Sequence, residues 1–137
     1  RCLIKGAGGA LLREKIVAAA SKRVVIVVDD RKRVSKLGSF PLPVEIVPFG
    51  RKVVSRQLRQ VGGIPQLRRA PGAAPYVTDE GNYILDCQFG AIHDPRALAA
   101  TISQITGVVE HGLFIDMVDT VIIAGDEGTQ VLDSLDV

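Results

Sequence analysis

The stretch KGAGGALLREK, from Lys5 to Lys15, combines residue types that can do acid–base chemistry. A lysine stands directly before a glycine-rich turn, and Glu14 follows in the first turns of a predicted helix. Glycines before a helix let backbone N–H groups approach an anion or a developing oxyanion, and the ammonium group adds a positive charge. A carboxylate held nearby could act as a general base. One turn of the backbone would position both charged groups.

Each part of this stretch also has a purely structural explanation. Lys5 to Gly9 matches neither the Walker phosphate loop nor the dinucleotide-binding fingerprint, so a tight turn with a solvated lysine is the better explanation of it taken alone. Glu14 taken alone is better explained as a favourable charge at a helix N-terminus. Asp29, Asp30 and Lys32 follow a predicted strand, where either a ligand contact or an ordinary polar loop is possible.

The elements around these residues predict an α/β fold. Residues 9–22 predict a helix with one apolar face, formed by Leu12, Ile16, Ala19 and Ala20. The run Val24–Val28 is continuously apolar and β-branched, which is typical of a strand buried on both faces. Asp29 and Asp30 lie at its carboxyl end, where open α/β sheets bind their ligands.

From Leu42 to Gly112 the pattern changes to a compact α+β unit. Prolines in GSFPLPVEIVPFG exclude a helix there and indicate a crossing into this unit. The predicted order is β-α-β-β-α-β, the split βαβ or ferredoxin-like motif. Its predicted elements are a strand at 44–49, a helix at 51–63, a strand at 65–69, a hairpin at 76–87 with its turn at 79–82, a helix at 94–107 and a strand at 108–114.

Outside this unit the chain predicts one helix and two apolar strands, 24–28 and 121–124. Two parallel strands covered on one side cannot bury both faces, so we expect further polypeptide to complete that sheet. The first residue is Arg1 and the single methionine is Met117. Both observations favour a fragment or a processed product.

Composition excludes several classes of function. Apolar residues make up 47% of the 137 residues and aromatic residues only 4%, so the core is built from Val, Ile, Leu and Ala. A net charge of +2 without stacking aromatics does not indicate nucleic-acid binding. We find no apolar run long enough for a membrane span and no secretory signal.

Four basic residues on one predicted helix indicate a solvated face or a subunit contact: Arg51, Lys52, Arg56 and Arg59.

The cysteines and histidines show no metal-binding pattern. Cys2 and Cys87 lack ligand spacing and are expected to be reduced thiols of a cytoplasmic protein. His93 and His111 also lack partners at ligand spacing and are expected to be ordinary loop or strand residues. We therefore predict no metal.

The pieces together resemble type A ribose-5-phosphate isomerase. The resemblance is carried in order by LIKGAGGALLREKIV, VVDDRKRVSKLGSFPLPVEIVPFG, RQL, VTDEGNYILDC, DP and ITGVVEHGLF. It runs without large gaps from about Leu3 to beyond Gly125, and the chain looks like roughly the C-terminal two-thirds of that enzyme. The resemblance implies a Rossmann-like α/β domain, partly formed by residues 1–41 and 113–137, and a ferredoxin-like lid domain at 42–112.

The resemblance also implies the chemistry. The family interconverts ribose 5-phosphate and ribulose 5-phosphate through an enediolate, without metal or organic cofactor, in the non-oxidative branch of the pentose phosphate pathway. Glu14 falls on the catalytic base, which moves a proton between C1 and C2. Lys5 falls on the group that stabilises the negative oxygen, helped by loop amides. The implied substrate-binding residues are Lys5, Gly6, Ala7, Gly8 and Lys32.

Two departures from the family pattern matter. Ala7 stands where many members have glycine, and its methyl group is tolerable if φ there is negative. The family's N-terminal half, which carries a Gly/Ser/Thr phosphate loop and an acidic D-G-A-D loop, is absent from these residues. We therefore expect the isolated chain to be inactive or nearly so. The family's lid contributes to subunit contacts, so we expect a homo-oligomer, a dimer or a tetramer.

Two other functions remain as alternatives. Related α/β domains act as sugar-phosphate sensors in transcription regulators, and a sensor could keep the glycine loop without needing a base. The presence of Glu14 together with Lys5 and Lys32 favours the enzyme. Residues 44–114 could also be a free-standing ligand-binding or assembly module, which the apolar strands outside that segment disfavour.

Overall fold

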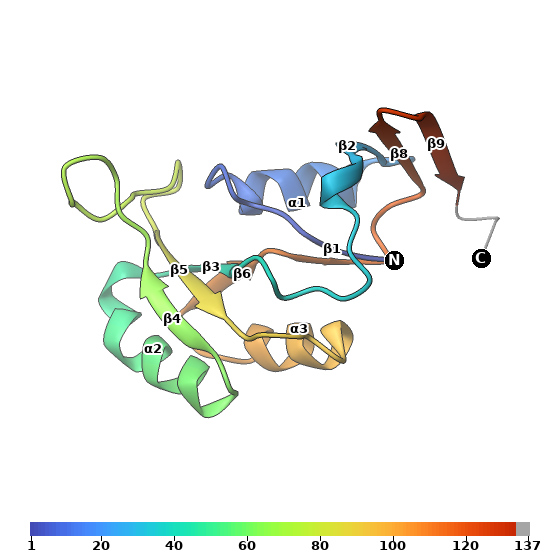
Figure 1. The fold of residues 1–137 in the computed structure, drawn as a ribbon. Helices are drawn as coiled ribbons and strands as arrows, with labels where there is room; N and C mark the ends of the chain where they lie inside the picture. Colours follow the sequence, from blue (N-terminus) through green and yellow to red (C-terminus); the bar gives the residue numbers. More distant parts are fainter. Residues whose placement is uncertain (134–137) are drawn as a thin grey trace.

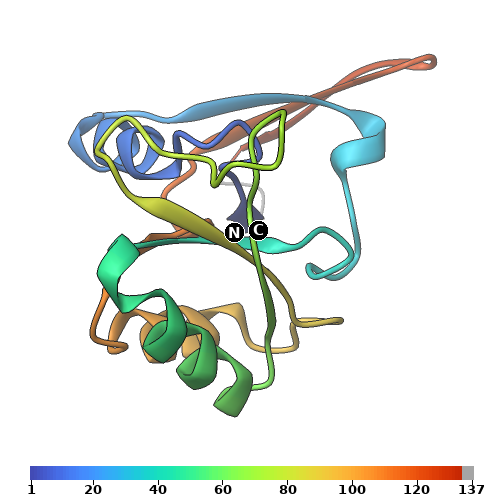
Figure 2. The same cartoon turned by 90° about the vertical axis from the view of Figure 1, so that its left-hand side faces the viewer.

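An antiparallel sheet of four strands, in the order β4-β5-β3-β6, holds most of the core in the computed structural model, which describes residues 1–133 (Figure 1). The strands are β3 (Leu42–Ile46), β4 (Ile64–Leu67), β5 (Tyr83–Gln88) and β6 (Val108–His111). Helices α2 (Arg51–Gln60) and α3 (Pro95–Ser103) cover one face, and α1 (Leu11–Ala20) lies over the other (Figure 2). Because helices cover both faces, all five residues of central strand β3 are buried.

The two helices beneath the sheet form as their sequences predict. Asp94 caps α3 by accepting a hydrogen bond from the Ala97 amide, and Pro95 occupies the first turn. Ile102 of α3 is fully buried, as are Val54 and Leu58 of α2. Every helix in the described part of the chain is too short or too polar to span a membrane. The predicted order β-α-β-β-α-β is the order observed.

The remaining strands form two smaller sheets. β2 (Val25–Asp29) pairs in parallel with β8 (Thr120–Gly125), as predicted, and β9 (Gly128–Asp133) adds to β8 in antiparallel orientation. β1 (Cys2–Ile4) pairs antiparallel with β7 (Leu113–Ile115). The sequence patterns predicted neither β1 nor β9, because β1 is very short and β9 has no apolar alternation on a buried face.

Two predictions within the unit were wrong. The expected single strand at 108–114 is two strands that separate at Gly112, since β6 pairs with β3 and β7 pairs with β1. The expected hairpin at 76–87 has its turn, where the Thr78 amide donates to the Asn82 carbonyl at 2.8 Å. Its first arm is not a strand, however, because β5 pairs with β4 instead.

The burial predicted for two apolar segments also differs. Val25 and Val27 of β2 are 46% and 68% exposed, so this strand is not buried on both faces. On α1 the predicted apolar face points outward: Ile16 is 58% exposed, and the buried residue is Leu11. The reason is that α1 packs against β6 and β3, whereas within residues 1–133 no element covers its opposite side.

A buried polar cluster attaches α1 to β6. The Lys15 ammonium donates to the Glu110 carboxylate at 2.7 Å and to the His111 carbonyl at 2.6 Å, and its pKa is lowered mainly by burial. The His111 ring lies 3.4 Å from Lys15 Nζ and 3.2 Å from Ser103 Oγ. Burial first, and then the positive charge of Lys15, lower the pKa of His111 to about 4.

We predict that His111 makes stability pH-dependent. In the unfolded chain the pKa of His111 returns to the ordinary 6.5. Between pH 6.5 and about 4 the unfolded state therefore binds a proton at His111 that the folded state does not bind. Stability therefore falls as the pH drops from 6.5 to about 4, by up to about 3 kcal/mol from this group. When the free energy of unfolding, measured in urea, is plotted against pH across this range, the slope should be shallower for His111→Gln than for wild type.

The matched control is His93→Gln, because His93 is exposed and lies outside this cluster. The plot of unfolding free energy against pH for His93→Gln should run parallel to that of wild type. A His111→Gln plot that is also parallel to wild type would contradict the assignment of this pH dependence to His111.

Candidate active site

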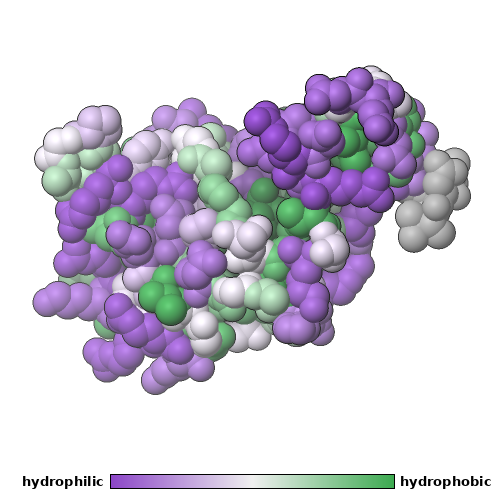
Figure 3. All heavy atoms as spheres, viewed as in Figure 1, coloured by the Kyte–Doolittle hydropathy of each residue, from purple (hydrophilic) through white to green (hydrophobic). Residues whose placement is uncertain are grey.

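A cavity of about 850 Å³ opens between the loop after β1, the start of α1 and the segment after β2. Every site residue implied by the family resemblance lines it: Lys5, Gly6, Ala7, Gly8, Glu14 and Lys32. Apolar side chains of β2 and β8, such as Val28 and Ile123, form another part of its wall. On the face shown in Figure 3, hydrophobic residues gather at the centre, between largely hydrophilic flanks. The tertiary structure thus joins two separate segments of sequence at one hollow.

Lys5 and Glu14 lie side by side in this cavity. Lys5 Nζ is 3.3 Å from Glu14 Oε1, and the two side chains are 28% and 37% exposed. The intervening loop reverses at Gly6, which has a φ of +97°, and the Gly9 amide closes the turn by donating to the Gly6 carbonyl at 2.9 Å. An ion pair this exposed adds little stability. Its two groups remain accessible to a ligand.

The cavity is strongly cationic. Among the described residues that line it, Glu14 is the single carboxylate, whereas five basic residues contribute: Arg1, Lys5, Arg31, Lys32 and Arg33. Asp29 and Asp30 do not line the cavity; Asp29 instead pairs with Arg31, whose hydrogen bond lowers the pKa of that carboxyl. Residues 1–133 hold no cluster of three or more His, Cys, Asp or Glu side chains that could bind a metal ion. The lining suits an anionic ligand.

The backbone of Lys5 is fixed by contacts with Gly112. The Lys5 amide donates to the Gly112 carbonyl at 2.8 Å, and the Gly112 amide donates to the Pro43 carbonyl at 2.8 Å. Phe114, two residues further and almost fully buried, lies beneath the ammonium group of Lys5, whose Nζ is 5.9 Å from the ring centroid. Ala7 does not have a positive φ, so its methyl group fits the loop.

Two further side chains, Arg68 and Tyr76, contact the loop of Gly6, Ala7 and Gly8, and sequence patterns did not identify them. Arg68 donates to the carbonyls of Gly6 and Ala7 at 3.1 and 3.0 Å, and the Tyr76 hydroxyl lies 3.4 Å from the Gly8 carbonyl. Arg68 stands beside Arg69 in an otherwise unremarkable LRRA stretch. The one signal that could have singled it out is strand alternation, which places Gln66 and Arg68 on the same face of β4 and its continuation.

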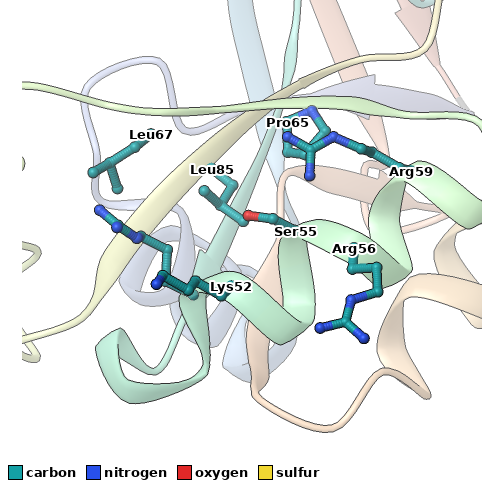
Figure 4. A pocket seen from close by; sticks show the side chains of 8 residues that line it. Lys52, Ser55, Arg56, Arg59, Pro65, Leu67 and Leu85 are labelled. Atoms are coloured by element: carbon teal, nitrogen blue, oxygen red, sulfur yellow. The ribbon is translucent and has the colours of Figure 1, made fainter.

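A smaller groove of about 430 Å³ lies beside α2, away from these residues (Figure 4). It is lined by Arg51, Lys52, Ser55, Arg56, Arg59, Pro65, Leu67 and Leu85. Figure 4 shows Arg56 and Arg59 extending away from each other rather than toward one point. Diverging cations agree with the solvated basic face expected from the sequence, and this groove offers no carboxylate for acid–base chemistry.

Comparisons with known proteins agree on one family. A sequence model of the family described as ribose 5-phosphate isomerase A (phosphoriboisomerase A) matches residues 1–128. The curated ribose-5-phosphate isomerase A of Roseiflexus sp. (strain RS-1) is 57% identical over 127 residues, which cover 92% of this chain and 54% of that protein.

Two solved structures show the same likeness. Ribose 5-phosphate isomerase A from Methanocaldococcus jannaschii superposes with a TM-score of 0.92 at 41% identity, covering 97% of this chain and 59% of that one. A D-ribose-5-phosphate isomerase in complex with phospho-erythronic acid has a TM-score of 0.93 at 36% identity, covering 96% and 58%. The chain therefore spans little more than half the length of these relatives.

We predict that Gly112→Ala destabilises the protein and displaces Lys5. An added Cβ would lie 2.3 Å from the Lys5 carbonyl oxygen and 2.8 Å from Pro43 Cδ, so the backbone has to move. The free energy of unfolding, measured in urea, should fall by about 3 kcal/mol, the upper range for overpacking. Gly8→Ala is the control, because its Cβ meets nothing within 4 Å and should change the stability little. Equal stabilities of the two variants would contradict this account of the junction.

Proposed function

Because this chain belongs to the ribose 5-phosphate isomerase A family, we propose that it carries the acid–base centre of an aldose–ketose isomerase acting on ribose 5-phosphate and ribulose 5-phosphate. The observation that supports this most directly is the 3.3 Å contact of Lys5 with Glu14 in a cavity that is otherwise cationic. A neighbouring structure is named as a complex with phospho-erythronic acid, a phosphorylated sugar acid, which supports a sugar phosphate as ligand.

In the proposed mechanism Glu14 shuttles one proton between two carbons. Its carboxylate removes the proton from C2 of the open-chain aldehyde, and the C–H electron pair forms the C1–C2 double bond of an enediolate. The negative charge that develops on the C1 oxygen is stabilised by the Lys5 ammonium group and by loop amides. The C2 hydroxyl then passes its proton to the C1 oxygen, and the protonated Glu14 gives its proton to C1 as the C2–O bond becomes the carbonyl of the ketone.

Substrate binding in this proposal uses the rest of the cationic lining. Lys32, on the turn after β2, is exposed and unpaired within the described residues, so its ammonium group is available to the phosphate-bearing substrate. The loop of Gly6, Ala7 and Gly8 contacts the reacting end. No metal or organic cofactor takes part in these steps.

The domain organisation and assembly are also proposals. Residues 42–112 would form a ferredoxin-like lid, which is supported by the β4-β5-β3-β6 order with two helices on one face. Residues 1–41 and 113–137 would form part of a Rossmann-like domain, supported by the parallel β2–β8 pair; the last four of them, 134–137, lie outside the described residues. We expect a homo-oligomer, which sedimentation of the complete polypeptide would test.

We predict that residues 1–137 alone turn over substrate weakly or not at all. The chain spans 54% of the first relative's length, and the implied phosphate-binding and acidic loops lie in the part of the family that it does not match. A coupled assay of the purified 137-residue chain measures this. Robust turnover by that chain would show that these residues hold a complete site.

Glu14→Gln separates an enzyme from a sensor. Glutamine keeps the size of the side chain but cannot take up a proton, so kcat should fall at least about 100-fold. Affinity for phospho-erythronic acid, measured by calorimetry, should stay within a few-fold of wild type. The measurement uses the complete polypeptide as its gene encodes it. Glu127→Gln is the control and should behave as wild type, since Glu127 lies in the exposed turn between β8 and β9.

A sugar-phosphate sensor gives a different result. Wild type would then bind the ligand without isomerising it, and Glu14→Gln would leave all measured properties unchanged. Wild-type turnover that survives in Glu14→Gln would reject Glu14 as the base.

A further inference from the structure

Arg68 connects the substrate loop to the four-stranded sheet. Its Nε and Nη2 atoms donate to both carboxylate oxygens of Asp86 on β5, at 2.8 and 2.6 Å. The remaining terminal nitrogen, Nη1, donates to the carbonyls of Gly6 and Ala7. Arg68 and Asp86 are only 15% and 26% exposed, so this bidentate pair is well shielded. One planar guanidinium group thus holds two successive peptide units of the loop.

Those two contacts decide where the loop amides point. In a trans peptide unit the carbonyl and the following N–H point in opposite directions, and none of the described peptide bonds is cis. With the Gly6 and Ala7 carbonyls directed at Arg68, the amides of Ala7 and Gly8 are directed away from it. Neither Arg68 nor Asp86 lines the cavity, whereas Ala7 and Gly8 do.

The two amides are free to bind a ligand. Within residues 1–133 the Ala7 and Gly8 amides donate to no acceptor, although the neighbouring amides of Lys5 and Gly9 both do. Both residues are exposed at the cavity. Two successive N–H groups on one side of a turn form an anion-binding concavity.

We propose that Arg68, oriented by Asp86, is a positioning residue that turns the Ala7 and Gly8 amides toward the oxygen that becomes negative during isomerisation. The inference rests on the proposed function and adds to it the device that orients the loop. Lysine cannot replace the arginine fully, because a single ammonium point charge cannot hold Asp86 in a bidentate pair and both carbonyls together. The Arg68 side chain touches no reacting atom.

The test compares variants of the complete polypeptide. Arg68→Lys keeps the charge, and the double variant Arg68→Gln with Asp86→Asn removes both charges so that no buried carboxylate is left unpaired. Arg69→Gln is the matched control, because Arg69 is the adjacent arginine and donates to the Ala73 carbonyl within its own loop. Thermal unfolding checks that each variant folds.

Two ligands separate positioning from a purely structural role. Phospho-erythronic acid carries a carboxylate in place of the developing oxyanion, whereas ribitol 5-phosphate has the phosphate but no charge there. We expect kcat and the affinity for phospho-erythronic acid to fall about 10- to 100-fold in the double variant, somewhat less than for outright loss of an oxyanion donor. The affinity for ribitol 5-phosphate should change less than about threefold, and Arg68→Lys should lie between the double variant and wild type.

Other outcomes overturn the inference. Wild-type kcat and analogue affinity in the double variant would show that the loop orients itself. An equal loss of affinity for both ligands would show that Arg68 only maintains the fold. If wild type does not isomerise, the proposed function fails separately, and a crystal structure of the double variant then decides: unchanged directions of the Gly6 and Ala7 carbonyls contradict the role of Arg68.

Discussion

The close backbone contact at Gly112 is the constraint on which the site depends. At this residue the chain passes from β6, which belongs to the four-stranded sheet, to β7, which pairs with β1. The Gly112 peptide groups bond Lys5 on one side and Pro43 on the other, at a distance that excludes any side chain. The backbone position of Lys5 is therefore set by its contact with the sheet at Gly112.

The loop of Gly6, Ala7 and Gly8 is held from two sides, which explains how a glycine-rich segment can present groups in a fixed direction. Gly112 fixes its start, and Arg68 fixes its middle through carbonyl contacts. Glycine is also favoured at Gly9, because φ there is +89° and an added Cβ would lie 2.2 Å from the Tyr76 hydroxyl. Preorganised donors of this kind stabilise a developing charge without reorganising during the reaction.

Local sequence signals predicted the helices and strands whose causes are also local. The cap at Asp94 and the apolar runs of β2 and β8 act over a few residues, and helix α3 and these two strands formed where the sequence predicted them. The outward-facing side of α1 could not be predicted in this way. Helix α1 is apolar on several sides. The side that packs depends on where β6 places Glu110 and His111, the partners of Lys15.

By itself the sequence determined which groups are candidates for the chemistry and their short-range order: Lys5 before a turn that favours glycine at Gly6, and Glu14 in the first turn of the helix that follows. Tertiary structure alone decided which distant residues support them. Arg68 meets Asp86 across 18 positions and Gly6 across 62, and Lys5 meets Gly112 across the whole inserted unit. Such contacts depend on strand register and on which strands become neighbours, and residue types along one stretch of chain carry no record of either.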